Sequence, residues 1–146
     1  MDDLDLTRAR VVDSTTVRGL LDAGFDAFEV IRQVARACEE WVPELFAAFM
    51  VAATTAVEGR NALNDAPSLP PARGGPKPSP AVSLPADVGH LADQLAALAA
   101  LLAQRLTDAA ARADLTGDRD ACEYAARAAA DLHQILRRGD DETAAR

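Results

Sequence analysis

Aromatic residues are scarce in this sequence: only six of its 146 residues are Phe, Trp or Tyr. Alanine, by contrast, occupies 33 positions, and hydrophobic residues make up 49% of the chain. Alanine has the highest helix propensity and contributes little bulk to a core. A core made of such residues requires helices that approach one another closely, so the composition predicts an all-α fold.

Basic residues are also few, and lysine is nearly missing. The chain has 14 arginines and one lysine against 23 acidic residues, which gives a net charge of −8. This use of Arg and Ala is typical of a GC-rich, bacterial genome. Nucleic acids and anionic membranes bind clustered Lys and Arg, so the balance argues against both as partners. The start of the chain has no basic segment followed by an apolar one, so we expect a cytoplasmic protein.

The patterns that carry catalysis or ligand binding are missing as well. Cys38 and Cys122 lie in helical apolar patterns, which favour small buried side chains over a disulfide or a nucleophile. His90 lies three residues from both Asp87 and Asp93, but a di-iron bundle needs a Glu-x-x-His motif on each of two helices. No glycine-rich phosphate loop occurs. We therefore expect no enzyme activity, no cofactor and no metal site.

The longest stretch without charge runs from Leu45 to Val57. Pro43 suits the first turn of a helix and Gly59 suits the residue after its end, so we predict a helix at 43–58. A helix without a polar face is stable only when it is covered all round, by the rest of the chain or by a partner. The predicted helix at 43–58 is shorter than the roughly 20 apolar residues that span a bilayer.

Two further helices are predicted before this one, at 14–23 and 26–41. Asp13 or Ser14 is the candidate cap of the first, and Gly24 suits its end. Asp26 and Glu29 have the spacing of a capping box for the second. The short connections require all three N-terminal helices to pack on one another.

The chain is thereby divided into four parts. Residues before Ser14 show no clear period and form an arm or a short helix. A segment rich in Pro and Gly separates the N-terminal helices from two C-terminal helices that form an antiparallel αα-hairpin. The predicted parts are a helical N-terminal module, a linker, the bundle-like hairpin and a disordered tail, at 1–63, 64–86, 87–138 and 139–146.

Leucines of the hairpin predict association. They follow coiled-coil spacing over two heptads and spread over more than one stripe, so two helices alone leave part of this surface uncovered. The N-terminal module could cover it, but a second copy would complete a four-helix bundle, which favours a homodimer. Tyr124 lies on the flank and would remain free for another protein. The candidate interface residues are Leu91, Leu95, Leu98, Leu102, Leu106 and Tyr124.

These features favour a non-catalytic module for protein–protein interaction or assembly, with a protein partner that the sequence does not name. A helix-turn-helix DNA-binding regulator at 14–40 is the alternative, because Arg32, Gln33 and Arg36 could face bases and phosphates. Acidic residues at both ends of the helix predicted at 26–41 would meet DNA phosphates, which argues against this alternative. A basic face that combined Arg18, Arg32 and Arg36 would favour DNA binding.

One local resemblance adds a third possibility. The segments LLDAGFDAFEVI at 20–31 and WVPELFAAFMVAATTAV at 41–57 resemble parts of the helical cap that precedes corrinoid-binding domains. The resemblance implies a corrinoid-cap-like accessory protein or a cofactor-dependent enzyme. However, the family's segment between these two stretches is largely missing here. Residues 131–136 partly resemble the family's histidine loop, but Leu136 stands where the family has glycine. No functional residue is transferred.

Overall fold

The computed structural model describes residues 3–41, 46–69 and 88–144. These residues form five α-helices and no strand, which confirms the all-α prediction. The helices are α1 (Asp3–Asp13), α2 (Val17–Trp41), α3 (Phe46–Asn64), α4 (Val88–Arg112) and α5 (Thr116–Ala144). The predicted position of Pro43 in a first helical turn, and the linker from residue 70 onward, lie outside the described residues.

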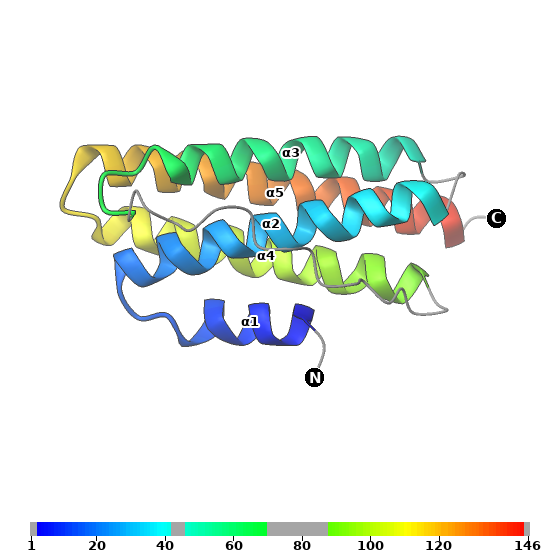
Figure 1. Ribbon diagram of the computed structural model, residues 1–146, viewed down its shortest axis with the longest axis horizontal. Coiled ribbons are helices and arrows are strands. Elements are labelled where there is room, and N and C mark those ends of the chain that lie inside the picture. The colour runs from blue at the N-terminus through cyan, green and yellow to red at the C-terminus, as the bar shows by residue number, and fades with distance from the viewer. Residues whose placement is uncertain (1–2, 42–45, 70–87, 145–146) are drawn as a thin grey trace.

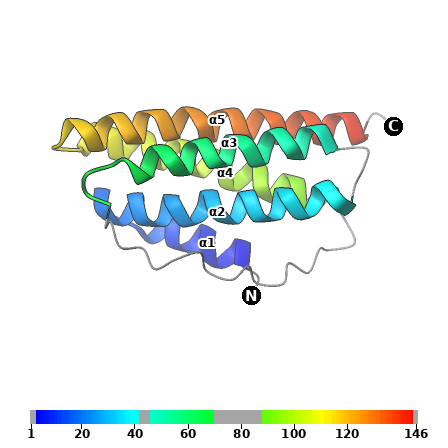
Figure 2. The same cartoon turned by 45° about the horizontal axis from the view of Figure 1, so that its top comes forward.

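The four long helices pack side by side as an elongated bundle, and the shorter α1 lies outside it (Figure 1). In this bundle α2 contacts α3 and α4, and α5 contacts the same two helices. Each helix runs antiparallel to these two neighbours (Figure 1). The turned view shows α1 packed along α2, and it also contacts α4 (Figure 2). Because α3 ends at the opposite end of the bundle from the start of α4, the connection between them has to be long.

A single hydrophobic core joins the N-terminal helices to the hairpin. Phe28 and Ile31 of α2, Leu63 of α3, Leu102 of α4 and Leu132 of α5 are all at most 1% exposed and belong to the same cluster. The hairpin leucines are thus covered by α2 and α3 of the same chain. The sequence left open whether the N-terminal module or a second copy covers them, and within the single chain the N-terminal module does.

Gly24 lies inside a helix, which corrects the prediction of two helices at 14–23 and 26–41. α2 is continuous across this residue. A methyl group at Gly24 would lie 3.0 Å from Leu63 Cδ1 and 3.6 Å from Leu106 Cδ2. Glycine weakens a helix by about 1 kcal/mol relative to alanine, and close packing of α2 against α3 and α4 offsets that loss.

Gly59 has the same role in α3, where we predicted a helix end. α3 continues to Asn64, and a Cβ at Gly59 would lie 2.5 Å from Cε1 of the Phe28 ring. Phe28 is fully buried, so the missing side chain makes room for its ring in the core. α5 likewise continues past Gly139 to Ala144, where a disordered tail was expected.

The cap of α2 also differs from the prediction. The backbone N–H of Gly19 donates to the hydroxyl oxygen of Thr16 at 3.0 Å, so Thr16 is the N-cap. Ser14 instead ends α1, because its hydroxyl donates to the carbonyl of Arg10 at 2.7 Å. The Arg10 side chain pairs with Asp22 at 3.3 Å and Asp26 at 2.6 Å, which holds α1 against α2.

The first residues of the predicted linker are packed onto α5. Asp118, only 3% exposed, accepts hydrogen bonds from the backbone N–H of Ser68 at 3.0 Å and from the Ser68 hydroxyl. A Cβ at Gly117 would lie 2.8 Å from the ring of Pro67, so this glycine permits the close approach. Leu69 is buried in the core. The described part of the linker is therefore part of the bundle.

Candidate functional site

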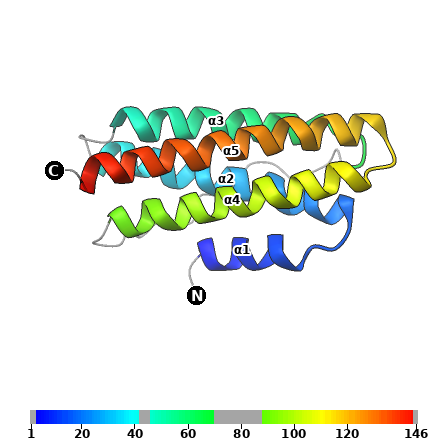
Figure 3. The ribbon, with the colours of Figure 1, turned by 180° about the vertical axis from the view of Figure 1, so that it is seen from behind.

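A groove runs between the C-terminal half of α4 and the N-terminal half of α5, two helices that lie along each other in the rear view (Figure 3). Its volume is about 790 Å³. Five of the nine residues that line it are alanines. The lining therefore reflects the alanine-rich sequence of both helices.

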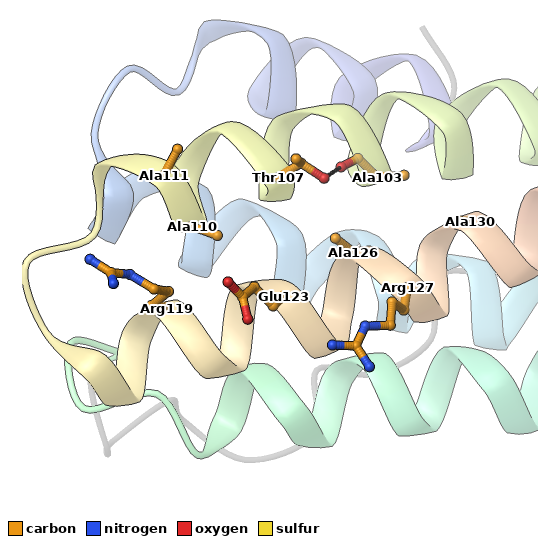
Figure 4. A pocket seen from close by; sticks show the side chains of 9 residues that line it. All are labelled: Ala103, Thr107, Ala110, Ala111, Arg119, Glu123, Ala126, Arg127 and Ala130. Atoms are coloured by element: carbon orange, nitrogen blue, oxygen red, sulfur yellow. Dashed lines mark hydrogen bonds between the residues drawn. The ribbon is translucent and has the colours of Figure 1, made fainter.

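The α4 side of the groove and the alanines of α5 that line it are uncharged. Ala103 and Ala110 come from α4, and Ala126 and Ala130 come from α5 (Figure 4). The polar group on this side is the Thr107 hydroxyl, which donates to the carbonyl of Ala103 at 2.7 Å. This hydroxyl is satisfied within its own helix, so the wall presents few free polar groups to a ligand.

The α5 side of the groove is charged. Arg119, Glu123 and Arg127 follow one another at every fourth residue, and Figure 4 shows their side chains in a row along the helix. Arg119 donates from Nη2 to the carbonyl of Ala113 at 3.2 Å. Within the part of the chain that the structure describes, Glu123 and Arg127 make no hydrogen bond or ion pair. Both charges are available to a partner.

The cysteines are buried away from this groove's surface and are weak nucleophiles. Cys38 on α2 and Cys122 on α5 are free and fully buried. Burial raises the pKa of each thiol to about 11, and the carboxylates of Asp118 and Glu123 contribute to the rise at Cys122. Because the thiolate is the nucleophilic form, neither thiol is activated near neutral pH.

Within the described ranges, neither histidine belongs to a cluster of metal ligands. His133 of α5 donates from Nδ1 to the carbonyl of Ala96 on α4 at 3.0 Å, since a carbonyl oxygen only accepts. His90 is exposed on α4, and Asp87, which the sequence placed beside it, lies outside the described residues. Among the described residues, no three or more His, Cys, Asp or Glu side chains are grouped so as to hold a metal ion.

A second surface feature is the outward face of the first half of α3. Met50 and Val51 are each 45% exposed, and Ala47 and Thr54 are exposed on the same side. The Thr54 hydroxyl donates to the carbonyl of Met50 at 3.1 Å, so its polar group is satisfied within the helix. The inner face of α3 is covered by the bundle, while this uncharged outer face is not.

No protein-family model, no curated protein and no solved structure matches this chain. Function has to be inferred from the chain's own surfaces. Among the described helices, none is long and apolar enough to cross a membrane.

The candidate interface residues separate into two groups. The five leucines of α4 are buried, with exposures between 0% and 3%, so they are not a free surface of the folded chain. A charge at Leu98 would disrupt the core whether or not the protein dimerises. Tyr124 is 53% exposed on α5 and remains accessible. The proposed homodimer therefore needs a different surface.

The turn required by the helix-turn-helix alternative is missing, since α2 is one helix from Val17 to Trp41. The capping box is not formed either. Glu29 accepts from Arg32 at 3.0 and 3.1 Å, and also from Arg60 of α3. Burial acts to raise the pKa of Glu29, but the hydrogen bonds and charges of Arg32 and Arg60 together lower it. Arg32 is thus engaged in a pair that holds α2 to α3.

The sequence interpretation missed the charged row of α5 and the exposure of Met50. The row has a readable signal, because charged residues of alternating sign occur at a spacing of four. The exposed face of α3 was harder to predict. The helix has no polar side from Phe46 to Val57, which indicated that other elements have to cover it all round. The sequence did not indicate which side of the helix would stay uncovered.

Proposed function

We propose that this protein is a non-catalytic module for protein–protein interaction, and that the outward face of α3 is its docking surface for another protein. The observation that carries the proposal is the pair Met50 and Val51, adjacent large apolar side chains that are each 45% exposed. The face around them has no charge. The expected partner is the apolar face of another helix.

The size of the effect supports a binding role. Complete burial of a Met or Val side chain is worth about 1.5–3 kcal/mol, so the exposed part of each retains roughly 1 kcal/mol. Specific interfaces bury at least about 1,000 Å² in total, so a partner has to cover more of α3 than these two residues. Ala47 and Thr54 extend the uncharged face over about two helical turns.

The test compares surface variants of one helix. Met50→Glu and Val51→Glu place a charge on the proposed surface, while Asn61→Glu places the same charge on an exposed position further along α3. The Asn61 variant keeps an oxygen that can accept from Arg60. All three variants should retain the parent's helicity and melting temperature, because none of the positions is buried.

Proteins captured by the parent and by each variant are compared by quantitative mass spectrometry, and the selected partner is purified for titration. We expect Met50→Glu and Val51→Glu to weaken binding by at least about tenfold, and Asn61→Glu to leave it unchanged. Equal binding of the purified partner to the parent and to the Met50 variant would refute the proposal.

We also retain a homodimer within this proposal, although the hairpin leucines cannot be its interface in the folded chain. The alternating charges of α5 offer a better surface, which is independent of α3.

A further inference from the structure

The outer surface of α5 carries a longer charged row than the groove alone shows. After Arg119, Glu123 and Arg127, the next residue at the same spacing is Asp131, and all four are exposed. The row extends from residue 119 to residue 131, roughly 18 Å of helix. Its charges alternate in sign from one end to the other.

Most of these charges have no partner among the residues that the structure describes. Opposite charges four residues apart often pair along a helix. Here Glu123, Arg127 and Asp131 form no ion pair or hydrogen bond within the described ranges, and Arg119 has one bond, to a backbone carbonyl. The row thus presents unpaired charges to a partner.

We infer that α5 pairs with α5 of a second copy of this chain, antiparallel across a two-fold axis that crosses the exposed face of α5 midway between Glu123 and Arg127. This register places Arg119 opposite Asp131 of the other copy and Glu123 opposite Arg127 of the other copy. The two-fold axis repeats each pair, so four attractive pairs form from one row. A surface that contacts itself in this way makes a closed dimer.

The charge pattern selects this register. A shift of one helical turn in either direction sets Arg127 or Glu123 against its own counterpart and places like charges together. A parallel arrangement sets every residue of the row against itself. The antiparallel register centred between Glu123 and Arg127 is thus the arrangement in which all four residues meet opposite charges, and like charges disfavour the parallel arrangement and the one-turn shifts.

The neighbouring surface permits close approach. Ala130 and Gln134 are exposed beside the row and carry no charge, and Ala126 borders the alanine-lined groove. Small side chains let two helices pack toward the short end of the usual range of about 8–10 Å between axes. Glu123 and Arg127 would lie nearest the axis, and the long side chain of Arg119 would reach the outer carboxylate.

A second copy is the occupant that this evidence supports. A different protein would need the same alternation at the same spacing, whereas a copy supplies it by symmetry. Pairing through α5 does not depend on docking at the α3 surface, so an experiment that refutes one proposal does not affect the other.

Charge reversal tests it. Glu123→Arg and Arg127→Glu each replace the two central attractions by repulsions, which should raise the dimer dissociation constant roughly 30-fold at low ionic strength. Mixing the two single variants should restore association as a heterodimer, because Arg at 123 in one chain then meets Glu at 127 in the other. The double variant should recover the homodimer for the same reason.

Arg137→Glu is the matched control, since it makes the same charge change at an exposed position of α5 beyond the row. Sedimentation velocity over a concentration series to the millimolar range gives the dissociation constants, and circular dichroism checks that the variants fold. A parent that stays monomeric throughout would overturn the inference. Single variants that dimerise like the parent, or a mixture that does not associate better than either variant alone, would also overturn it.

Discussion

The replacement of Gly59 by alanine would test how closely α2 and α3 approach. In an exposed helix interior this change is stabilising by about 1 kcal/mol, because alanine has the better helix propensity. In this bundle the new methyl group would lie 2.5, 2.6 and 2.9 Å from three ring carbons of Phe28. Carbon atoms normally pack about 3.5–4.0 Å apart, so the ring has to move by about 1 Å.

The ring has little space into which it can move, since Phe28 is fully buried. Overpacking of a core typically costs about 1–3 kcal/mol. We therefore expect Gly59→Ala to be destabilising by about 1–2 kcal/mol despite its better propensity, with a melting temperature roughly 3–8 °C lower. Thermal and urea unfolding followed by circular dichroism measure this change.

Two comparisons make the test specific. Gly24→Ala would meet the end of a flexible side chain, Leu63 Cδ1 at 3.0 Å, and should change stability much less. In a Phe28→Leu background, which removes the ring, Gly59→Ala should become neutral or stabilising. If Gly59→Ala alone raises the melting temperature, the close approach of α3 to the Phe28 ring is not real.

Three further results are expected. Glu29→Gln should be less stable than the parent at neutral pH. Because the pKa of Glu29 is lower in the folded than in the unfolded protein, the stability that its carboxylate contributes is present above the unfolded pKa and is lost in acid. The difference in free energy of unfolding between parent and variant should therefore narrow as pH falls below 4.5. Glu58→Gln, exposed on the same pair of helices, is its control, and an equal gap at all pH values would contradict the assignment. Asp118→Ala should lower the free energy of unfolding by about 1–3 kcal/mol in urea titrations, since it leaves two donors unpaired; no loss would mean that the connection after α3 is not held there. Cys38 and Cys122 should react slowly with a thiol reagent in the native protein and rapidly in denaturant, and fast native labelling would contradict their burial.

The sequence alone determined that the fold is all-α. The alanine content and the leucine spacing correctly indicated helices, but the leucines of α4, which were predicted as interface residues, are buried within the single chain. These features depend on local propensity and on a period of 3.6 residues, and both are readable from neighbours along the chain.

Helix ends depended on tertiary packing at two glycines. Gly24 and Gly59 have the residue type that commonly follows a helix end, yet both lie inside helices without a positive φ angle. What decides between the two roles is a neighbour far along the chain: Leu63 for one and the Phe28 ring for the other. Local sequence does not contain that neighbour.

Tertiary packing also decided which surfaces remain exposed to a partner. The leucines of α4 need a cover, and either α2 and α3 or a second copy satisfies that need by the same hydrophobic effect, so the sequence did not choose between them. Once the single chain covers them, the free surface shifts to the outward faces of α3 and α5. The charged row from Arg119 to Asp131 is visible as a spacing of four, but only the tertiary structure shows that all four side chains are exposed. Burial is a property of the whole bundle, and for that reason it decided which residues remain available to a partner.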